Sequence, residues 1–336
     1  MNSTSLQNIK YSILDLAIIT EGQAPGDAIR GTRNLAIKAE ELGYSRFWLA
    51  EHHNMENIAS SATAVLIGHM AEATESMRIG SGGIMLPNHS PLVIAEQFGT
   101  LATLYPGRID LGLGRAPGSD QATAQEIRPD RMNQVRHFPD NIKKLQRYFS
   151  EQSENDDIRA IPGMGTNVPL WVLGSSTDSA RLAAALGLPY VFASHFAPQQ
   201  LLPALKIYHE NFTPSKQLDE PYTMTCLNVV AAETDERAEW LATSLKQMMM
   251  GVVTGERDPM PPPVENMKEI WNYRERMAVE EMLSRSIIGS KKTVKKKLLD
   301  FEDETKADEI MIISHIYNED ERLKSYEIFS EIMQGK

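Results

Sequence analysis

Cysteine is nearly absent from this chain. Cys226 is the only one among 336 residues, so no intrachain disulfide can form. The lack of disulfides is typical of a reducing compartment, and we expect a cytoplasmic protein. Cys226 lies in the apolar segment TMTCLNVVAA with no histidine nearby, which predicts an inert core residue.

Long apolar runs and an excess of basic residues are also missing. No apolar run reaches the roughly 18 residues of a membrane helix. The N-terminal segment MNSTSLQNIKYS lacks the apolar stretch of a signal peptide. The net charge is -11, and acidic and basic residues are mixed along most of the chain. These features predict neither a nucleic-acid partner nor a membrane partner.

The chain does contain a regular alternation of apolar runs and amphipathic stretches. Near-continuous apolar runs are typical of parallel strands that are buried on both faces. Eight strand and helix pairs over this length predict a single-domain (β/α)8 TIM barrel covering 1–336, with a doubly wound open sheet as the alternative. The predicted strands are 11–19, 46–51, 78–86, 108–114, 168–176, 189–194, 222–232 and 308–314. The predicted helices are 28–42, 60–74, 90–105, 178–186, 198–212 and 235–250, with a closing helix through 332.

Two segments interrupt the alternation. Residues 118–133 are polar and predict a mobile loop after the fourth strand. Residues 251–263 are rich in proline and glycine, and the charged stretch that follows, up to Gly289, predicts helix. Long insertions after barrel strands usually cover the active-site mouth, so we interpret 118–133 and 251–289 as candidate lids. For the first of them, a disordered surface loop is an equal alternative.

Polar residues and glycines follow several of the predicted strands. In a barrel, the carboxyl ends of the strands and the loops after them form the active-site face. We therefore expect these residues to gather on one rim: Glu51, His52, His53, Gly82, Gly83, Asn88, His89, Gly112, Gly114, Arg115, Gly174, Ser175, Ser176, Ser179, Ser194 and His195.

Three of these features are compatible with a flat, phosphorylated ligand. The segment GSSTDSA follows a strand and opens a helix, where backbone N–H groups and hydroxyls suit a phosphate, although an ordinary helix cap is the alternative. Arg115 stands among small residues and can clamp a phosphate, although a structural ion pair is the alternative. Gly82-Gly83 leaves a strand end without side chains, which suits a flat ring or a simple tight turn.

Together these features predict a mononucleotide flavin rather than a dinucleotide. GLGRAPG has the first two glycines of the GxGxxG fingerprint, but Pro117 replaces the third. This departure argues against tight binding of NAD or FAD.

The histidine pattern does not favour a metal. Metal-binding strands usually carry His-x-His because side chains alternate between the two faces, whereas His52 and His53 are adjacent. We predict no metal site, and interpret the inward histidine as a general base or hydrogen-bond donor beside a ligand. His137, His209 and His315 are interpreted as structural groups.

Several long stretches resemble the bacterial-luciferase-like, flavin-dependent monooxygenases, over nearly the whole chain. The matching stretches are LGYSRFWLAEHH, RIGSGGIMLPNHSPLVIAEQFGTL, YPGRIDLGLGRAPGSD, VPLWVLGSSTDSARLAAALGLP, FASHFAP and DEIMIIS. The resemblance implies a (β/α)8 barrel that takes reduced FMN (FMNH2) from a separate NAD(P)H:flavin reductase and uses O2 to oxidise a small organic substrate. It also implies a homodimer built on the helices that contain AVLIGHMAEAT and VIAEQFGTLATLY.

The resemblance assigns roles to individual positions. His52 matches the family's catalytic histidine. Gly82-Gly83 matches a non-prolyl cis peptide that lies against the flavin ring. Arg115, Ser176 and Ser179 match the phosphate-binding positions, and Ser175 is adjacent to them. The reactive cysteine of the luciferases has no counterpart, since Cys226 falls in another strand, and the aldehyde pocket is not recognisable, so light emission is not implied.

Two other functions remain open. One is an F420-dependent oxidoreductase on the same fold, and the other is a non-catalytic flavin-binding protein. Neither the organic substrate nor the reductase is identified by the sequence.

Overall fold

The computed structural model describes residues 6–336, and these form a closed parallel barrel. β1 pairs with β2 on one side and β9 on the other, while β6 pairs with β7, so the ring of eight strands closes. The (β/α)8 prediction is confirmed and the open sheet is excluded. The barrel strands are β1 (Lys10–Asp15), β2 (Arg46–Leu49), β3 (Arg78–Met85), β4 (Ile109–Gly114), β5 (Leu170–Gly174), β6 (Tyr190–Phe192), β7 (Thr223–Ala232) and β9 (Glu309–Ile313).

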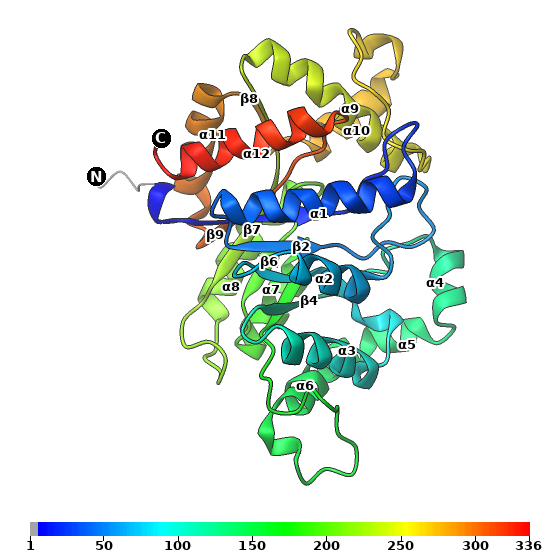
Figure 1. Cartoon of the computed structure of the whole chain (residues 1–336), viewed down its shortest axis with the longest axis vertical. Helices are drawn as coiled ribbons and strands as arrows, with labels where there is room; N and C mark the ends of the chain where they lie inside the picture. Colours follow the sequence, from blue (N-terminus) through cyan, green and yellow to red (C-terminus); the bar gives the residue numbers. More distant parts are fainter. Residues whose placement is uncertain (1–5) are drawn as a thin grey trace.

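Helices surround the barrel, as Figure 1 shows. Within residues 6–336, no helix has the length and apolar character needed to cross a membrane. The helices are α1 (Pro25–Glu41), α2 (Thr63–Glu72), α3 (Pro91–Leu104), α4 (Gln121–Ile127), α5 (Arg131–Arg136), α6 (Phe138–Phe149), α7 (Thr177–Leu186), α8 (Leu201–Asn211), α9 (Asp235–Thr254), α10 (Tyr273–Met282), α11 (Lys291–Thr305) and α12 (Glu319–Met333).

The strands bury both of their faces, which explains their near-continuous apolar sequences. Side chains alternate along a strand, so one set fills the barrel interior and the other packs under the helices. Trp48 and Met224 belong to the interior cluster. Their neighbours Phe47 and Leu227 belong to the larger cluster between the strands and the helices.

A ninth strand, β8 (Ile287–Ser290), lies outside the barrel. β7 is long enough to serve two partners: Met224–Asn228 pairs with β9, and Val229–Ala232 pairs with β8. The segment 264–289 was expected to be helical, and this is only partly right. It contains α10 but ends in β8, because the distal half of β7 offers an unpaired edge that local sequence does not reveal.

The segment 118–133 is not the predicted loop. It consists largely of α4 and the beginning of α5. The Asp120 side chain accepts the backbone N–H of Thr123 at 2.9 Å and caps α4. The predicted start of the second helix was also too early, since α2 begins at Thr63. Ser60 does not cap it, because its hydroxyl donates instead to the carbonyl of Ala50 at 2.5 Å.

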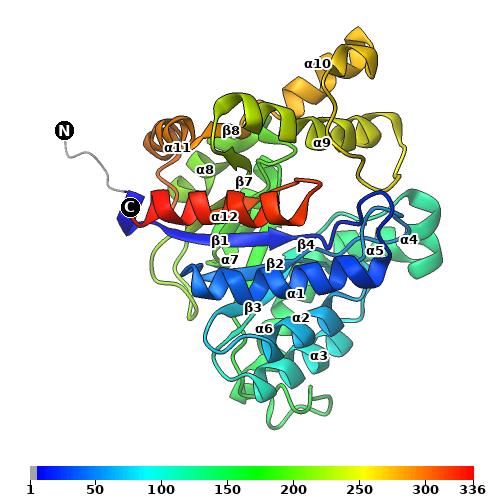
Figure 2. The ribbon, with the colours of Figure 1, turned by 45° about the horizontal axis from the view of Figure 1, so that its top comes forward.

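The two insertions lie at the carboxyl end of the strands and contact one another. In Figure 2, α4 and the chain that leaves α9 lie beyond the arrowhead of β1. The backbone N–H of Met260 donates to the carbonyl of Ile19 at 2.9 Å, just past the end of β1. Arg257 forms an ion pair of 3.5 Å with Asp120. Segments 118–133 and 251–263 are therefore positioned over the barrel mouth, and their function as lids stays a prediction.

Candidate active site at the barrel mouth

Every residue predicted for the rim except Ser179 lies in the carboxyl half of a barrel strand or in the loop that follows it, and Ser179 lies in the first turn of α7. The ring order is β1-β2-β3-β4-β5-β6-β7-β9. His52 follows β2, Gly82-Gly83 lies within β3, Arg115 follows β4, and Ser175 and Ser176 follow β5. The predicted cofactor residues thus lie in or after β3, β4 and β5, and the predicted catalytic residue His52 follows the neighbouring strand β2, so the predicted set lies along one arc of the mouth.

Glu51 anchors the loop after β2 instead of facing a ligand. Its side chain is almost fully buried and accepts hydrogen bonds from His53 Nε2 at 2.9 Å, His89 Nε2 at 2.8 Å and the backbone N–H of Met85 at 3.0 Å. Burial alone would raise its pKa, but these hydrogen bonds outweigh burial and lower the pKa to about 2. Asn88 also donates to Glu51, at 3.3 Å. The carboxylate therefore fixes the ends of β2 and β3 relative to each other.

This anchor extends to the loop after β4. The Asn88 side chain also donates to the carbonyl of Pro117 at 3.0 Å and accepts from Arg131 Nε at 2.9 Å. Arg131 in turn donates to the carbonyl of Arg115 at 2.8 Å. The backbone around Arg115 is consequently held in place by α5, an arrangement that local sequence does not predict.

His52 is the one histidine of the adjacent pair that is free to act. His53 is occupied by Glu51, whereas Nδ1 of His52 is buried and has no hydrogen-bond partner within residues 6–336. Burial lowers the pKa of His52 because it disfavours the charged imidazolium, and the nearby charge of Arg257 acts in the same direction. His52 is therefore a neutral imidazole near physiological pH, able to accept or release a proton.

The peptide bond between Gly82 and Gly83 is cis, which is the geometry that the family resemblance implies. A Cβ on Gly83 would lie 2.7 Å from the carbonyl oxygen of Gly112, and one on Gly82 would lie 2.7 Å from Cδ1 of Leu14. Gly83 is thus required by the close approach of the β4 backbone, whether or not a ring lies against it, whereas a Cβ on Gly82 would meet only the end of the Leu14 side chain. Their contact with a ligand stays a prediction.

The predicted phosphate residues differ in their availability. The Arg115 side chain is exposed and has neither an ion pair nor a hydrogen bond within the described chain. Ser176 is the N-cap of α7, and its hydroxyl makes no capping bond. Ser179 is different, because its hydroxyl donates to the carbonyl of Ser176 at 2.6 Å and contacts the Tyr190 hydroxyl at 3.0 Å. The geometry of Ser179 favours positioning of the Ser176 turn over direct contact with a phosphate.

The remaining arc of the rim carries polar residues that the sequence left without a role. His195 follows β6, Asn228 lies in β7 and His315 follows β9. Burial lowers the pKa of His195 and of His315 to about 3. His315 was interpreted as a structural group, yet it lies beside His195 at the mouth. Asn228 lies within an apolar run, so the sequence carries no separate signal for it. Residues two apart on a strand share a face, and this spacing from Cys226 and Met224 indicates that Asn228 faces the barrel interior.

Cys226 is fully buried in the barrel interior, as the sequence predicts. Burial raises the pKa of its thiol, so the thiol stays protonated.

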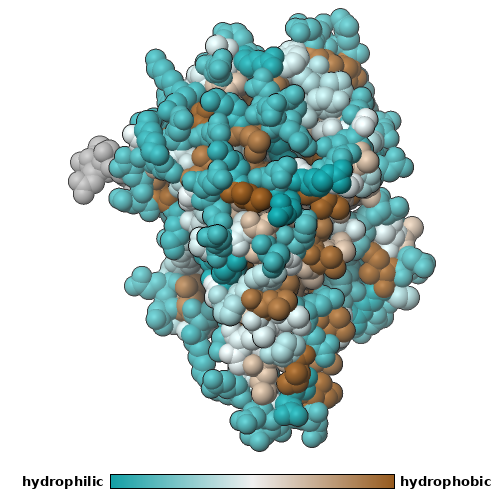
Figure 3. All heavy atoms as spheres, in the orientation of Figure 1, coloured by the Kyte–Doolittle hydropathy of each residue, from teal (hydrophilic) through white to brown (hydrophobic). Residues whose placement is uncertain are grey.

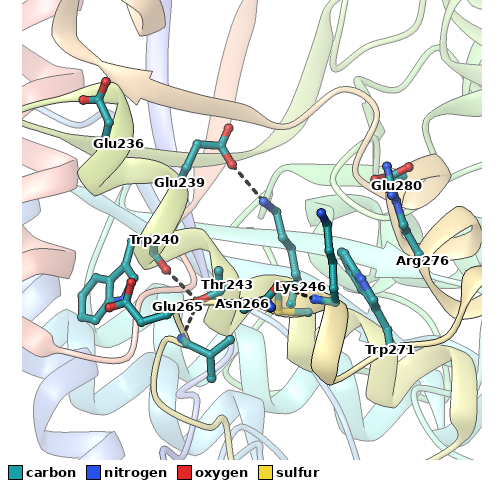
Figure 4. A pocket seen from close by; sticks show the side chains of 13 residues that line it. Glu236, Glu239, Trp240, Thr243, Lys246, Glu265, Asn266, Trp271, Arg276 and Glu280 are labelled. Atoms are coloured by element: carbon teal, nitrogen blue, oxygen red, sulfur yellow. Dashed lines mark hydrogen bonds and ion pairs between the residues drawn. The ribbon is translucent and has the colours of Figure 1, made fainter.

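A separate groove of about 490 Å³ lies away from the mouth, along α9. Figure 4 shows Trp240 and Lys246 of α9 on one side of it, with Trp271 and Arg276 on the other. None of the residues that line it comes from a barrel strand end. The groove is therefore not part of the candidate active site.

A closed parallel barrel with polar residues converging on its mouth defines a barrel enzyme of the (β/α)8 class. The sequence model of the luciferase-like monooxygenases matches residues 10–307. The chain belongs to the luciferase-like monooxygenase family, a family of oxidoreductases.

Individual relatives agree with this assignment. The chain is 49% identical to a luciferase-like monooxygenase of Escherichia coli, with 98% of each chain covered. It is 32% identical to the N-acetyl-S-alkylcysteine monooxygenase of Bacillus subtilis, over 96% of this chain and 98% of the relative. The crystal structure of apo-MsnO8 superposes with a TM-score of 0.90 at 32% identity, covering 96% of this chain and 98% of the other.

More distant relatives bind two different cofactors. The oxygenating constituent of 3,6-diketocamphane monooxygenase from Pseudomonas putida, solved in complex with FMN, shares the fold with a TM-score of 0.72 at 16% identity, over 97% of this chain and 98% of the other. An F420-dependent glucose-6-phosphate dehydrogenase of Nakamurella multipartita is 24% identical over 76% of this chain and 78% of the relative. One protein of this fold was thus solved with FMN, and another relative is named as F420-dependent.

Proposed function

We propose that this protein is a two-component monooxygenase that takes FMNH2 from a separate NAD(P)H:flavin reductase and uses O2 to oxidise a small organic substrate. The observation that carries the proposal is the arc from β2 to β5. It ends in a free guanidinium, Arg115, on the strand next to the Ser176 turn, and it begins with His52, whose Nδ1 has no partner in the described chain. Four neighbouring strands span about 14 Å at roughly 4.8 Å per strand, which suits a planar ring joined to a phosphate by a short chain.

Each residue on this arc has a defined part in the proposal. Arg115 would bind the phosphate with paired charge-assisted hydrogen bonds, and the hydroxyls of Ser175 and Ser176 would complete the site at the start of α7. Ser179 would hold the Ser176 carbonyl. Gly82 and Gly83 would allow a ring to lie against the strand. Bound FMNH2 would supply the electrons that activate O2, and His52 would hold or transfer a proton next to the reacting atoms.

The first experiment separates the two cofactors. Purified protein is titrated with FMN, anaerobic FMNH2 and F420, and the dissociation constants are compared. The proposal expects FMNH2 to bind more tightly than F420, and O2 uptake to require added NAD(P)H and a flavin reductase. Tighter binding of F420, with hydride transfer to or from it, would favour the F420-dependent alternative that some relatives represent.

The second experiment tests His52 against an exposed histidine. Small thioethers are the first substrates to test, because one relative acts on N-acetyl-S-alkylcysteine. His52→Ala should lose most of the turnover while keeping FMN binding, and His209→Ala, on the exposed face of α8, should keep both. If both variants retained the wild-type rate of substrate-dependent O2 uptake, a non-catalytic flavin-binding protein would be the better interpretation.

A homodimer built on α2 and α3 is part of the proposal. These helices leave apolar side chains uncovered: Val65 is 71% exposed, Val93 45% and Leu104 63%. Figure 3 shows brown and pale residues over this part of the surface. Sedimentation should give a dimer for the wild type and a monomer for Val65→Lys combined with Leu104→Lys. A wild-type monomer at micromolar concentration would contradict the dimer.

A further inference from the structure

The proposed FMN site uses only one half of the rim. Its residues belong to β2, β3, β4 and β5, whereas the ends of β6, β7 and β9 carry His195, Asn228 and His315. The ring contains eight strands, and β6 lies four positions away from β2 in either direction. His195 therefore stands on the wall of the mouth opposite His52.

Asn228 has a side chain whose orientation is fixed by its neighbours. Met224 and Cys226 face the barrel interior, so Asn228 continues that face toward the mouth. Its amide nitrogen donates to the carbonyl of His195 and to the Ser286 hydroxyl at 3.3 Å. Because a carbonyl only accepts, the nitrogen and oxygen of the amide are assigned without ambiguity. Oδ1 is left buried with no partner within residues 6–336.

His195 also has a polar atom without a hydrogen-bond partner. Its Nδ1 is also buried and unpartnered within the described chain. The charges of His52 and His195 would repel each other, and this repulsion adds to the effect of burial on the pKa of His195. An unpaired buried polar atom costs about 1–3 kcal/mol. Asn228 and His195 are joined by a hydrogen bond and each has one such atom, so the pair calls for a binding partner.

We propose that His195 and Asn228 form the substrate-binding subsite of the mouth, and that this subsite binds an uncharged hydrogen-bond donor group of the organic substrate, an amide N–H or a hydroxyl. The inference rests on the proposed monooxygenase function and adds the chemistry of the substrate group. Asn228 Oδ1 accepts the hydrogen bond. His195 is neutral and either accepts or donates, according to its tautomer.

The surroundings of the subsite exclude a charged group. Arg322, the guanidinium near His315, is already paired with Asp15. Arg115 lies on the other arc of the rim, after β4, and Arg257, whose charge acts on His52, is paired with Asp120 at 3.5 Å. A carboxylate or phosphate bound between His195 and Asn228 would lose its hydration without gaining a counter-charge, which is strongly unfavourable. An uncharged hydrogen-bond donor loses much less hydration free energy.

The experiment uses three probes of one shape: benzamide, N,N-dimethylbenzamide and benzoate. Histidine-labelled full-length protein is titrated with each probe, with and without FMN, and the ring resonance of His195 is followed by NMR. A His195→Gln variant assigns that resonance. Benzamide should shift the signal, whereas N,N-dimethylbenzamide, which lacks the N–H donor, and benzoate should bind at least about tenfold more weakly. Equal binding of both amides, tighter binding of benzoate, or no shift with any probe would overturn the proposal.

Variants of β7 locate the contact. Asn228→Leu should weaken benzamide binding at least about tenfold, while Asn228→Gln, which keeps both the acceptor oxygen and the N–H donor, should retain more of the binding. Thr225→Val is the matched control: its hydroxyl is also buried and unpartnered in the described chain, but it lies on the strand face that points away from the interior. If Asn228→Leu does not fold, the glutamine variant and the three probes still decide the result. Loss of binding in Thr225→Val as well would contradict the subsite.

The same titrations keep the two proposals distinguishable. The dissociation constant for FMN should stay within about twofold of wild type in the Asn228 variants, because the FMN arc ends at β5. A wild-type protein that does not bind FMN would refute the proposed function. The benzamide titration without FMN would still decide the subsite by itself.

Discussion

The two ends of the barrel differ in whether their buried polar side chains have partners. At the amino end of the strands, Asp110 and Glu309 are completely buried, and both are paired with arginine. Arg46 joins them: its Nη1 lies 2.6 Å from Asp110 and its Nε 3.2 Å from Glu309. Arg78 binds the other oxygen of Asp110 at 2.6 Å, and the Tyr222 hydroxyl donates to Glu309 at 2.8 Å.

The carboxyl end leaves hydrogen-bonding groups unused. His52, His195 and Asn228 each have a buried polar atom with no partner in the described chain, and Arg115 has no counter-charge there. Burial lowers the pKa of His52 and of His195 at the mouth, while at the other end the charges of Asp110 and Glu309 raise the pKa of Arg46 against the effect of burial. At the amino end these charged groups are paired and serve stability, whereas the carboxyl end keeps its capacity for ligands.

Removing one of the buried ion pairs at the amino end of the strands should have the largest effect on stability. Asp110→Asn removes a buried carboxylate and leaves Arg46 and Arg78 without their common partner. We expect the free energy of unfolding to fall by about 3–5 kcal/mol in chemical denaturation. Glu280→Gln, which removes the exposed pair with Arg276, is the control and should be indistinguishable from wild type. Equal stability of both variants would mean that the paired end does not hold the barrel together.

Acid should lower the stability of the protein first through the buried histidines at the carboxyl end of the barrel. Burial lowers the pKa of His195 and His315 to about 3, so below their usual pKa near 6.5 the unfolded chain binds more protons than the folded one. Stability should be full above about pH 6.5 and decrease toward lower pH. Glu51, with a folded pKa of about 2, adds its own loss only as the pH falls below about 4.5.

Denaturant unfolding at about pH 7 and about pH 5 isolates the histidines. His195→Gln should show a smaller loss of stability between these two values than the wild type does. His209→Asn, a change on the exposed side of α8, should leave the loss unchanged. A His195→Gln protein as acid-sensitive as the wild type would argue against a buried neutral imidazole.

Removing the free guanidinium should affect binding without affecting stability. Arg115→Ala should weaken FMN binding by about 10- to 100-fold, the usual effect of losing a charge-assisted hydrogen bond. Because Arg115 has no partner in the described chain, the unfolding free energy of the Arg115→Ala variant should match that of the wild type. Fluorescence titration measures the binding, with the exposed Arg159→Ala as the control. A destabilised Arg115→Ala protein would reveal a structural role instead.

The smallest effect is expected at the contact between the two insertions. Arg257 and Asp120 are both partly exposed and 3.5 Å apart, so their ion pair contributes little to stability. Arg257→Ala should change the KM for the organic substrate severalfold and leave unfolding unchanged, if these segments close over the mouth. An unchanged KM would remove the support for a lid at 251–263.

The sequence was most informative where each residue acts through its own strand. The eight apolar runs, the glycines of β3 and the polar residues after β2, β4 and β5 were all recognisable, because a parallel barrel places every strand's carboxyl end on one face. The sequence was least informative where a contact joins distant segments. Glu51 binds His89, Arg131 holds the backbone of Arg115, and the second half of β7 recruits β8. None of these contacts follows from local periodicity.

The sequence by itself determined the barrel, its orientation and the family, because hydrophobic periodicity and local motifs are properties of neighbouring residues. Only the tertiary structure decided which of two adjacent histidines is free, that Ser179 is bonded internally, and that His195 and Asn228 are left unsatisfied. Whether a polar atom is paired depends on what the closed ring brings against it, and that is settled only when all eight strands are in place.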